Sequence, residues 1–600
     1  MGRAGLTDRA GHRRARHRGL PAILGTTFPR TAAARSTAMG VSMSDYFDLG
    51  GYTRPVTTGS AQAQTWFARG LVWAYGFNHE EAAACFERAA VADPGCVMAH
   101  WGLAYALGPN YNKPWEAFGP GEAPSAISRA RAALAAAGDT GRPASPVERA
   151  LVHALAARYP ATGRAGDGPW DPADGAAWNA GYAAAMREVY RSHPDDLDVV
   201  ALFADALLNL TPWALWDTAT GEPAEGAATM EAKAVLDRAL ATPAGQAHPG
   251  VLHMYIHLME MSARPEEALP AADLLRDLVP DAGHLRHMPS HIDVLCGDYR
   301  SAAAANSAAI EADERFRARH GAMNFYTLYR AHNYHFKIYG AMFLGQQRTA
   351  LEAADQLAAA IPEDLLRVEN PPMADWLEGF VPMRLHVLIR FGRWPDILAA
   401  PLPADPGLYR VTTAMTHYAK GVAHAATGQV GKAAAQRELF TTAAAGVPES
   451  RTIFNNTCQD ILAVAGAMLD GELEYRRGNH DAAFRLLRHA VELDDGLPYD
   501  EPWGWMQPAR HALGALLLEQ GHVAEAEAVY RADLGLDATL ARPCQHPGNV
   551  WSLHGFHECL TRLGKWEEAG IVMQQLKIAA ARADVPVTSS CYCRLTAAAS

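Results

Sequence analysis

Short helical hairpins recur along most of this 600-residue chain. Each unit has a first helix of large and small apolar residues, a turn, and an alanine-rich second helix. The segment WFARGLVWAYGFNHEEAAACFERAAVADP, residues 66–94, shows the whole unit, with Ala82, Phe86 and Ala89 in the second helix and Pro94 after it. Small and large residues at such positions let neighbouring hairpins stack, so the pattern predicts an array of packed helices.

The same anchors, a turn followed by alanines in the second helix, recur often enough to predict at least eight hairpins. Further examples are EEALPAADLLRDLVP, GDYRSAAAANSAAIEAD, GQQRTALEAADQLAAAIP, FGRWPDILAA, TGQVGKAAA, RGNHDAAFRLLRHAVE, QGHVAEAEAVY and LGKWEEAGIVM. This pattern resembles the tetratricopeptide repeat (TPR), a helix-turn-helix unit of about 34 residues. The resemblance implies an all-α fold, a TPR-like α-solenoid in which the hairpins form a right-handed superhelix.

The hairpin pattern divides the chain into five predicted parts. Residues 1–42 lack a hydrophobic pattern and are expected to be a disordered N-terminal extension, with a transit or twin-arginine signal as the alternative. TPR-like repeats are predicted at 43–118, an irregular helical region with loops at 119–245, histidine-rich TPR-like repeats at 246–400, and further TPR-like repeats at 401–600.

Composition limits the partners of such a chain. The formal net charge is −12 although the first 42 residues carry eight arginines and one aspartate, so the remainder is strongly acidic. That balance argues against nucleic acid or an anionic membrane as a partner, and no apolar run reaches the length of a transmembrane helix. Eight cysteines without a paired framework favour a cytoplasmic protein, although Cys591 and Cys593 in CYCR are open to a ligand or redox role.

Histidine is crowded into one part of the sequence. Nine of the 25 histidines lie between positions 248 and 335. The segment HMYIHLMEM contains two of them and HLRHMPSH three, and the next predicted repeat adds a further pair. The histidines singled out as predicted metal ligands are His253, His257, His284, His287, His291, His332 and His335.

The spacing of these histidines follows the repeat. His253 and His287 are 34 residues apart, as are His257 and His291, which is one repeat length. Residues three or four apart share a helix face. In TPR proteins this face lines the concave groove, so the resemblance implies that the histidines share one channel. Packed helices lie about 8–10 Å apart, a gap that two imidazoles can bridge through a metal.

Paired imidazoles predict a transition-metal site. Histidines at i and i+4 of a helix can chelate one ion, and a histidine-rich set with few carboxylates suits copper first, then iron or zinc. Glu260 and Tyr339, which lie on the same helix face in their repeats, are the predicted catalytic residues. Four further histidines have undecided roles as ligands, orienting partners or structural groups; they are His100, His386, His554 and His557.

The sequence therefore favours a metal-dependent enzyme, a copper or iron oxidoreductase acting on a small-molecule substrate. Two alternatives are a zinc-dependent hydrolase and a TPR scaffold that binds a partner peptide in its groove. Scaffolds of that kind usually line the groove with Lys, Arg and Asn, whereas this chain has histidine there. No glycine-rich nucleotide motif, H-E-x-x-H motif or nucleophile elbow supports another enzyme class.

Overall fold

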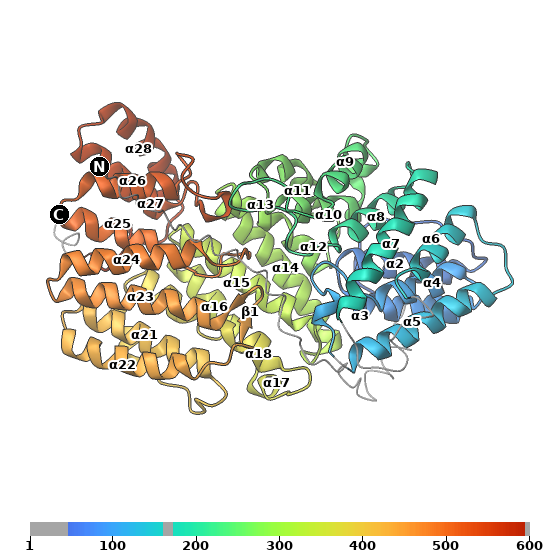
Figure 1. The fold of residues 1–600 in the computed structure, drawn as a ribbon, viewed down its shortest axis with the longest axis horizontal. Helices are drawn as coiled ribbons and strands as arrows, with labels where there is room; N and C mark the ends of the chain where they lie inside the picture. The colour runs from blue at the N-terminus through green and yellow to red at the C-terminus, as the bar shows by residue number, and fades with distance from the viewer. Residues whose placement is uncertain (1–45, 120, 160–171, 595–600) are drawn as a thin grey trace, which may run out of the picture.

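The chain folds into successive antiparallel helical hairpins, with one short two-stranded sheet in the described part of the chain. The computed structural model describes residues 46–119, 121–159 and 172–594. In Figure 1 the N-terminal helices lie at the right, the C-terminal hairpins at the left, and α10–α15 between them. The predicted all-α, TPR-like hairpin array is confirmed. The predicted extension at 1–42 lies outside the described residues.

The N-terminal half is a series of helices that pack mainly on their neighbours in the chain. Asn78, Asp196 and Asp298 accept backbone N–H groups of the first helical turn with their side chains, which explains why helices begin after them. The helices are α2 (Ala61–Tyr75), α3 (His79–Ala92), α4 (Val97–Ala106), α5 (Glu122–Asp139), α6 (Pro146–Ala156), α7 (Pro172–Ser192), α8 (Leu197–Leu208), α9 (Thr229–Leu240), α10 (Pro249–Met259), α11 (Leu269–Leu275), α12 (Gly283–His287) and α13 (Pro289–Leu295), with 3-10 turns at Trp115–Ala117, Gly245–Ala247 and Pro265–Ala268.

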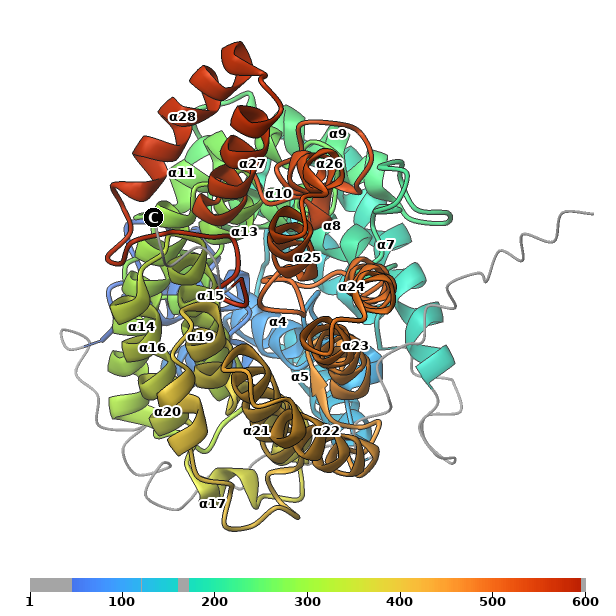
Figure 2. The same cartoon turned by 90° about the vertical axis from the view of Figure 1, so that its left-hand side faces the viewer.

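The C-terminal half contains the more regular hairpins, and α21 to α28 follow one another along an arc (Figure 2). Its helices are α14 (Tyr299–His320), α15 (Thr327–Phe343), α16 (Gln347–Ala360), α17 (Glu363–Leu366), α18 (Met373–Leu377), α19 (Met383–Arg390), α20 (Trp394–Ala399), α21 (Arg410–Ala426), α22 (Val430–Ala445), α23 (Cys458–Arg476), α24 (His480–Asp495), α25 (Ala509–Glu519), α26 (Val523–Asp533), α27 (Val550–Arg562) and α28 (Trp566–Ala580), with 3-10 turns at Glu378–Phe380 and Arg542–Cys544. Strands β1 (Thr452–Ile453) and β2 (Asn456–Thr457) pair antiparallel.

Seven of the hairpins share one turn, in which a glycine directly precedes the N-cap of the second helix. These glycines have φ between +63° and +84°, a region that residues with a Cβ rarely adopt. The N-cap residue after the glycine donates its N–H to the carbonyl five residues earlier, which is the Schellman arrangement. The glycines are Gly297, Gly345, Gly392, Gly428, Gly478, Gly521 and Gly564.

Buried apolar side chains form two large clusters. One cluster consists mainly of residues of α2–α13, such as Phe67 and Leu202, and the other consists mainly of residues of α13–α27, such as Leu388 and Ala465. Helices α10, α12, α13 and α15 lie where the two clusters meet. The predicted histidines are on these four helices.

Six cysteines are free in the described residues, whereas Cys591 and Cys593 of CYCR, which the sequence left open to a redox role, are joined by a disulfide. None of the helices in the described ranges is both long and apolar enough to cross a membrane. Helices α5–α9 lie in the range 119–245, and the five-part division of the chain stays a prediction.

Candidate metal centre

Six of the seven predicted histidine ligands come together in two groups of three. The first group, the α10 triad, consists of His253, His257 and His284. The second, the α15 triad, consists of His287, His291 and His332. Within each triad, one ligand atom from each imidazole lies within 4.8 Å of the others. All six side chains are buried, with 0–7% of their surface exposed.

The α10 triad has imidazole nitrogens that are buried and unpaired. His253 Nδ1 lies 2.6 Å from the Tyr75 carbonyl oxygen, and His257 Nδ1 lies 2.9 Å from Glu260 Oε1. These acceptors require the proton on Nδ1, which leaves each Nε2 with a lone pair. Both Nε2 atoms, and both ring nitrogens of His284, have no hydrogen-bond partner among the described residues. A buried polar atom without a partner is costly unless a ligand satisfies it.

The α15 triad contains an unusually close pair of nitrogens. His287 Nδ1 lies 2.8 Å from Asn306 Oδ1, and the Asn306 amide is oriented because its Nδ2 donates to the Ala302 carbonyl oxygen. His291 Nδ1 lies 2.7 Å from Glu260 Oε2. With Glu260 ionised, both rings carry their proton on Nδ1 when neutral, and their Nε2 lone pairs face each other at 2.7 Å. Two facing lone pairs repel, whereas a shared cation would be bound by both.

Glu260 connects the two triads. Its two carboxylate oxygens reach His257 of the α10 triad and His291 of the α15 triad, and these three side chains also form a group with ligand atoms within 4.8 Å. Glu501 Oε2 lies 3.1 Å from the same Nδ1 of His291. Tyr499 donates its hydroxyl to Glu501 and also approaches the Glu260 carbonyl oxygen at 3.0 Å. Carboxylates on Nδ1 fix the tautomer and orientation of metal-binding imidazoles.

Burial controls the charge of the site. It lowers the pKa of five triad histidines well below 6.5, and neighbouring imidazoles add to the effect; these are His253, His257, His284, His287 and His332. The rings are therefore neutral at neutral pH, which is the form that binds metals. Burial also raises the pKa of the Glu260 and Glu501 carboxyl groups well above their usual range. A bound cation would favour their ionised form.

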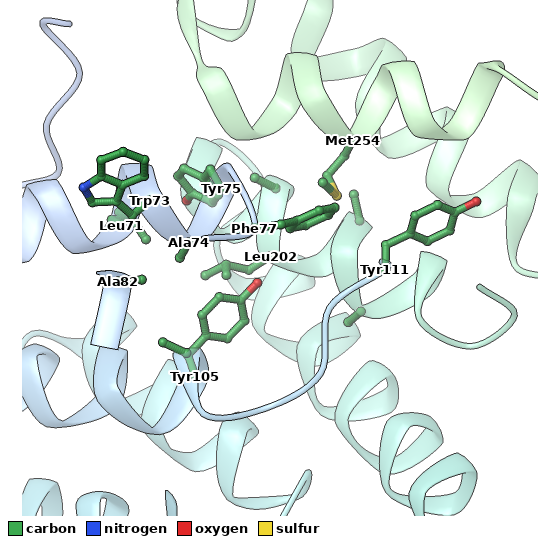
Figure 3. Packing of buried hydrophobic residues seen from close by; sticks show 14 of the residues in the cluster. Leu71, Trp73, Ala74, Tyr75, Phe77, Ala82, Tyr105, Tyr111, Leu202 and Met254 are labelled. Carbon is green, nitrogen blue, oxygen red and sulfur yellow. The ribbon is translucent and has the colours of Figure 1, made fainter. Parts of the chain in front are cut away.

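A phenyl ring packs on each triad. The Phe77 ring lies 4.6 Å from the His253 ring and 5.6 Å from the rings of both His257 and His284. On the other triad, Phe336 lies 5.2, 5.5 and 5.6 Å from the imidazoles of His287, His291 and His332. Figure 3 shows Phe77 in the buried cluster beside Met254 of α10.

Two tyrosines also reach the α10 triad. Tyr111, between α4 and α5, lies 4.8 Å from the His257 ring, and Tyr329 of α15 lies 4.8 Å from the His284 ring. Sequence reasoning missed Phe77, Tyr111 and Glu501 as site residues, because they are far from the histidines in the chain.

Two predicted site residues lie outside the triads. His335 is 2.8 Å from the Met506 sulfur and packs on Phe380. Tyr339 packs on Phe343 with the two rings tilted, and no ring contact within the described ranges joins it to a triad imidazole. Their metal-binding and catalytic roles stay predictions. The expected open groove is not observed, because the two helical cores meet around the triads and bury them.

The histidines of undecided role are also outside the triads. His386 packs on Trp505, and His100 is hydrogen-bonded to the Pro94 carbonyl oxygen. His554 and His557 lie on α27, among the C-terminal hairpins. The ends of the array therefore do not contribute a ligand to the metal groups found in the described residues.

Comparisons with known proteins add little beyond the fold. No protein-family model matches the sequence, and no curated protein matches it. The solved structure of Naa15/Naa10 bound to HypK-THB is similar over 86% of this chain and 70% of that one, with a TM-score of 0.21 and 13% identity. A Rap protein complexed with competence and sporulation factor matches 59% of this chain and 94% of its own, with a TM-score of 0.29 and 13% identity.

Yeast Tom70 is similar over 87% of this chain and 89% of its own length, with a TM-score of 0.24 and 11% identity. These likenesses are too distant to say anything about function. The protein is defined by its own features, as an all-α, TPR-like array of helical hairpins. Its particular character is a buried cluster of six histidines at the junction of the two cores.

Proposed function

We propose that this chain is a metal-dependent oxidoreductase that binds two transition-metal ions, copper first, one in each histidine triad. The observation that carries the proposal is the pair of Nε2 atoms of His287 and His291, 2.7 Å apart with both Nδ1 atoms committed to oxygen acceptors. When Glu260 is ionised and each of the two imidazoles has a single proton, that proton lies on Nδ1, and no proton is left to join the two Nε2 atoms. A cation between them would remove the repulsion.

The unpaired nitrogens of the α10 triad support a second ion. Each triad offers three imidazole nitrogen donors, which would leave room for a substrate or dioxygen on a bound metal. Imidazole donors with few carboxylates suit copper better than the carboxylate-rich sites of di-iron proteins. Glu260, shared between the triads, would fix the spacing of the two ions. Bound copper, or iron in its place, would supply the electron transfer to dioxygen.

The reaction we propose is the oxidation of a small molecule by dioxygen. Two substrate molecules each lose two electrons and two protons, and one dioxygen takes them up as two waters. Glu260 and Asn306 would hold the ligand protons on Nδ1 throughout. The phenyl rings on each triad would keep bulk water away, which strengthens the electrostatic interactions inside the site.

A zinc-dependent hydrolase is the second candidate, because three histidines with an open position are also a catalytic zinc arrangement. Zinc would lower the pKa of a bound water and generate a nucleophile. A scaffold that binds a partner peptide is less consistent with buried triads, since a peptide needs an open surface. We propose a cytoplasmic protein with a small-molecule substrate, and neither nucleic acid nor membrane as partner.

Metal analysis by inductively coupled plasma mass spectrometry tests this function. Tag-free protein is purified without chelator and reconstituted with copper, iron and zinc in turn. We expect about two copper or iron ions per chain, and oxygen uptake in an oxygen electrode with ascorbate or catechol as the electron donor. Retention of zinc alone would favour the hydrolase. If the protein binds no metal tightly in any reconstitution, the peptide-binding scaffold is the better interpretation.

A further inference from the structure

One hairpin turn departs from the pattern of the other seven. The turn between α2 and α3 has the same backbone arrangement, because the N-cap residue Asn78 donates its N–H to the carbonyl of Trp73, five residues earlier. The residue before the N-cap is in the left-handed region, with φ +55°. That residue is Phe77, whereas the other seven turns have glycine.

Phenylalanine is a poor choice for this turn. Its Cβ is close to the following carbonyl oxygen in the left-handed conformation, and such residues persist only where the surrounding structure imposes them. The ring of Phe77 supplies a reason, because it contacts all three imidazoles of the α10 triad. The turn therefore carries an unfavourable backbone conformation at the position from which a phenyl ring reaches the triad.

The other strained residues repeat this relation. Within the described ranges, three non-glycine residues have positive φ, namely Phe77, Trp213 and Phe454. Trp213 lies 6.1 Å from the His257 ring, and Phe454 lies 4.8 Å from the His332 ring. All three are aromatic and all three contact a triad. Backbone strain of this kind gathers at functional sites.

We propose that Phe77 is a specificity-determining residue of the metal centre, whose ring covers the side of the α10 triad on which it packs. This inference rests on the proposed function. In the ring contacts of the described residues, Phe77 contacts the α10 triad alone and Phe336 the α15 triad alone, so each phenyl ring covers one triad. The Phe77 ring would thus keep an added anion from reaching a metal in the α10 triad from the side that the ring covers.

The test compares wild type with Phe77→Gly, which restores the residue used in the other seven turns. A second variant, Phe77→Asn, also tolerates the left-handed conformation and guards against a failure peculiar to glycine. The control is Phe484→Ala, which removes a buried phenyl ring from α24, in a cluster of the C-terminal hairpins. The first measurement uses metal-free protein and diethyl pyrocarbonate, which modifies accessible neutral imidazoles, with each histidine followed by peptide mass mapping.

In Phe77→Gly we expect His253, His257 and His284 to react about tenfold faster, equivalent to about 1.4 kcal/mol less protection. The α15 triad, still covered by Phe336, should react as in wild type. Equal rates in wild type and variant, or equal acceleration of all six histidines, would overturn the proposal, the latter because it marks general loosening. The control should change neither triad.

The second measurement uses protein loaded with cobalt(II), whose visible absorption depends on coordination number, and titration with azide. We expect Phe77→Gly to bind azide about tenfold more tightly than wild type, with weaker absorption as the cobalt gains a ligand. Unchanged affinity and spectrum would overturn the role of Phe77. If neither protein binds cobalt or any other metal, the proposed function fails, and the imidazole modification rates still decide whether Phe77 covers the triad.

Discussion

Replacing Glu260 with glutamine changes one oxygen to an amide nitrogen at the link between the triads. In the present structure the carboxylate accepts Nδ1–H groups from both His257 at 2.9 Å and His291 at 2.7 Å. Glutamine has one acceptor oxygen, so its NH2 group must face one of the two imidazoles. That imidazole then has to move its proton to Nε2, the atom that binds the metal.

The expected loss follows from this single misplaced proton. Removing the orienting partner of a metal-binding histidine typically reduces metal affinity by about 10–100-fold, or about 1.4–2.7 kcal/mol. The metal-free protein should be no less stable, because burial raises the pKa of Glu260 and so disfavours its charged form. A neutral amide avoids that cost.

Competition titration with a chromophoric chelator measures the metal affinity of Glu260→Gln, and urea unfolding measures the stability of its metal-free form. Glu148→Gln is the matched control, since Glu148 is a buried carboxylate that accepts from Thr57 and Ser145 and contacts no histidine ligand. Undiminished affinity in Glu260→Gln would refute the orienting role. A loss of affinity of the same size in Glu148→Gln would attribute the effect to folding.

Three further predictions concern the ligands, the pH dependence and the turns. His257→Ala and His287→Ala should each reduce the bound metal from about two ions to about one per chain without unfolding the array, whereas His386→Ala should retain both; metal analysis with circular dichroism decides. Burial lowers the pKa of His386 to about 4, so between about pH 6.5 and pH 4 the unfolded chain binds a proton that the folded chain does not. Its contribution to the free energy of unfolding falls by about 1.4 kcal/mol per pH unit as the pH decreases, and is absent above about pH 6.5, where both states are neutral. Urea unfolding at several pH values measures how the free energy of unfolding changes with pH. In His386→Gln this slope should be smaller by the share of one proton, about 1.4 kcal/mol per pH unit, and an unchanged slope would contradict the prediction. Gly428→Phe, in a turn with open space around the added Cβ, should destabilise the protein by about 1–2 kcal/mol, and a neutral effect in urea unfolding would show that the left-handed turn tolerates phenylalanine.

The hairpins and the histidine pairs could be predicted from sequence because both are local or periodic. The four-residue spacing predicted the pairs His253/His257 and His287/His291, and the 34-residue repeat related one pair to the other; each pair lies within one triad. The place of His284 was less predictable. Proline at 289 begins a new helix, α13, directly after α12, and His284 at the start of α12 completes the α10 triad instead of joining His287.

Residues that reach the site from distant parts of the chain left no periodic signal. Glu501 follows α24 and meets His291 only because the hairpins of the second core pack against α13. The sequence does carry a signal at Phe77, because a phenylalanine stands there at the turn position that is glycine in the other seven hairpins. His335 and Tyr339 share the helix face of His332 but lie further along α15. There His335 contacts Met506 and Tyr339 contacts Phe343, and neither joins a triad.

The contact between Tyr499 and Glu260 joins residues 239 positions apart. A ribosome translating this chain completes all six triad histidines well before it reaches Tyr499 and Glu501. During that interval His291 lacks one of the two carboxylates beside its Nδ1, and the C-terminal hairpins that help to bury the triads do not yet exist. The finished histidine cluster therefore requires the chain to be made at least as far as Glu501, and metal acquired earlier would bind to an open and only partly oriented set of imidazoles.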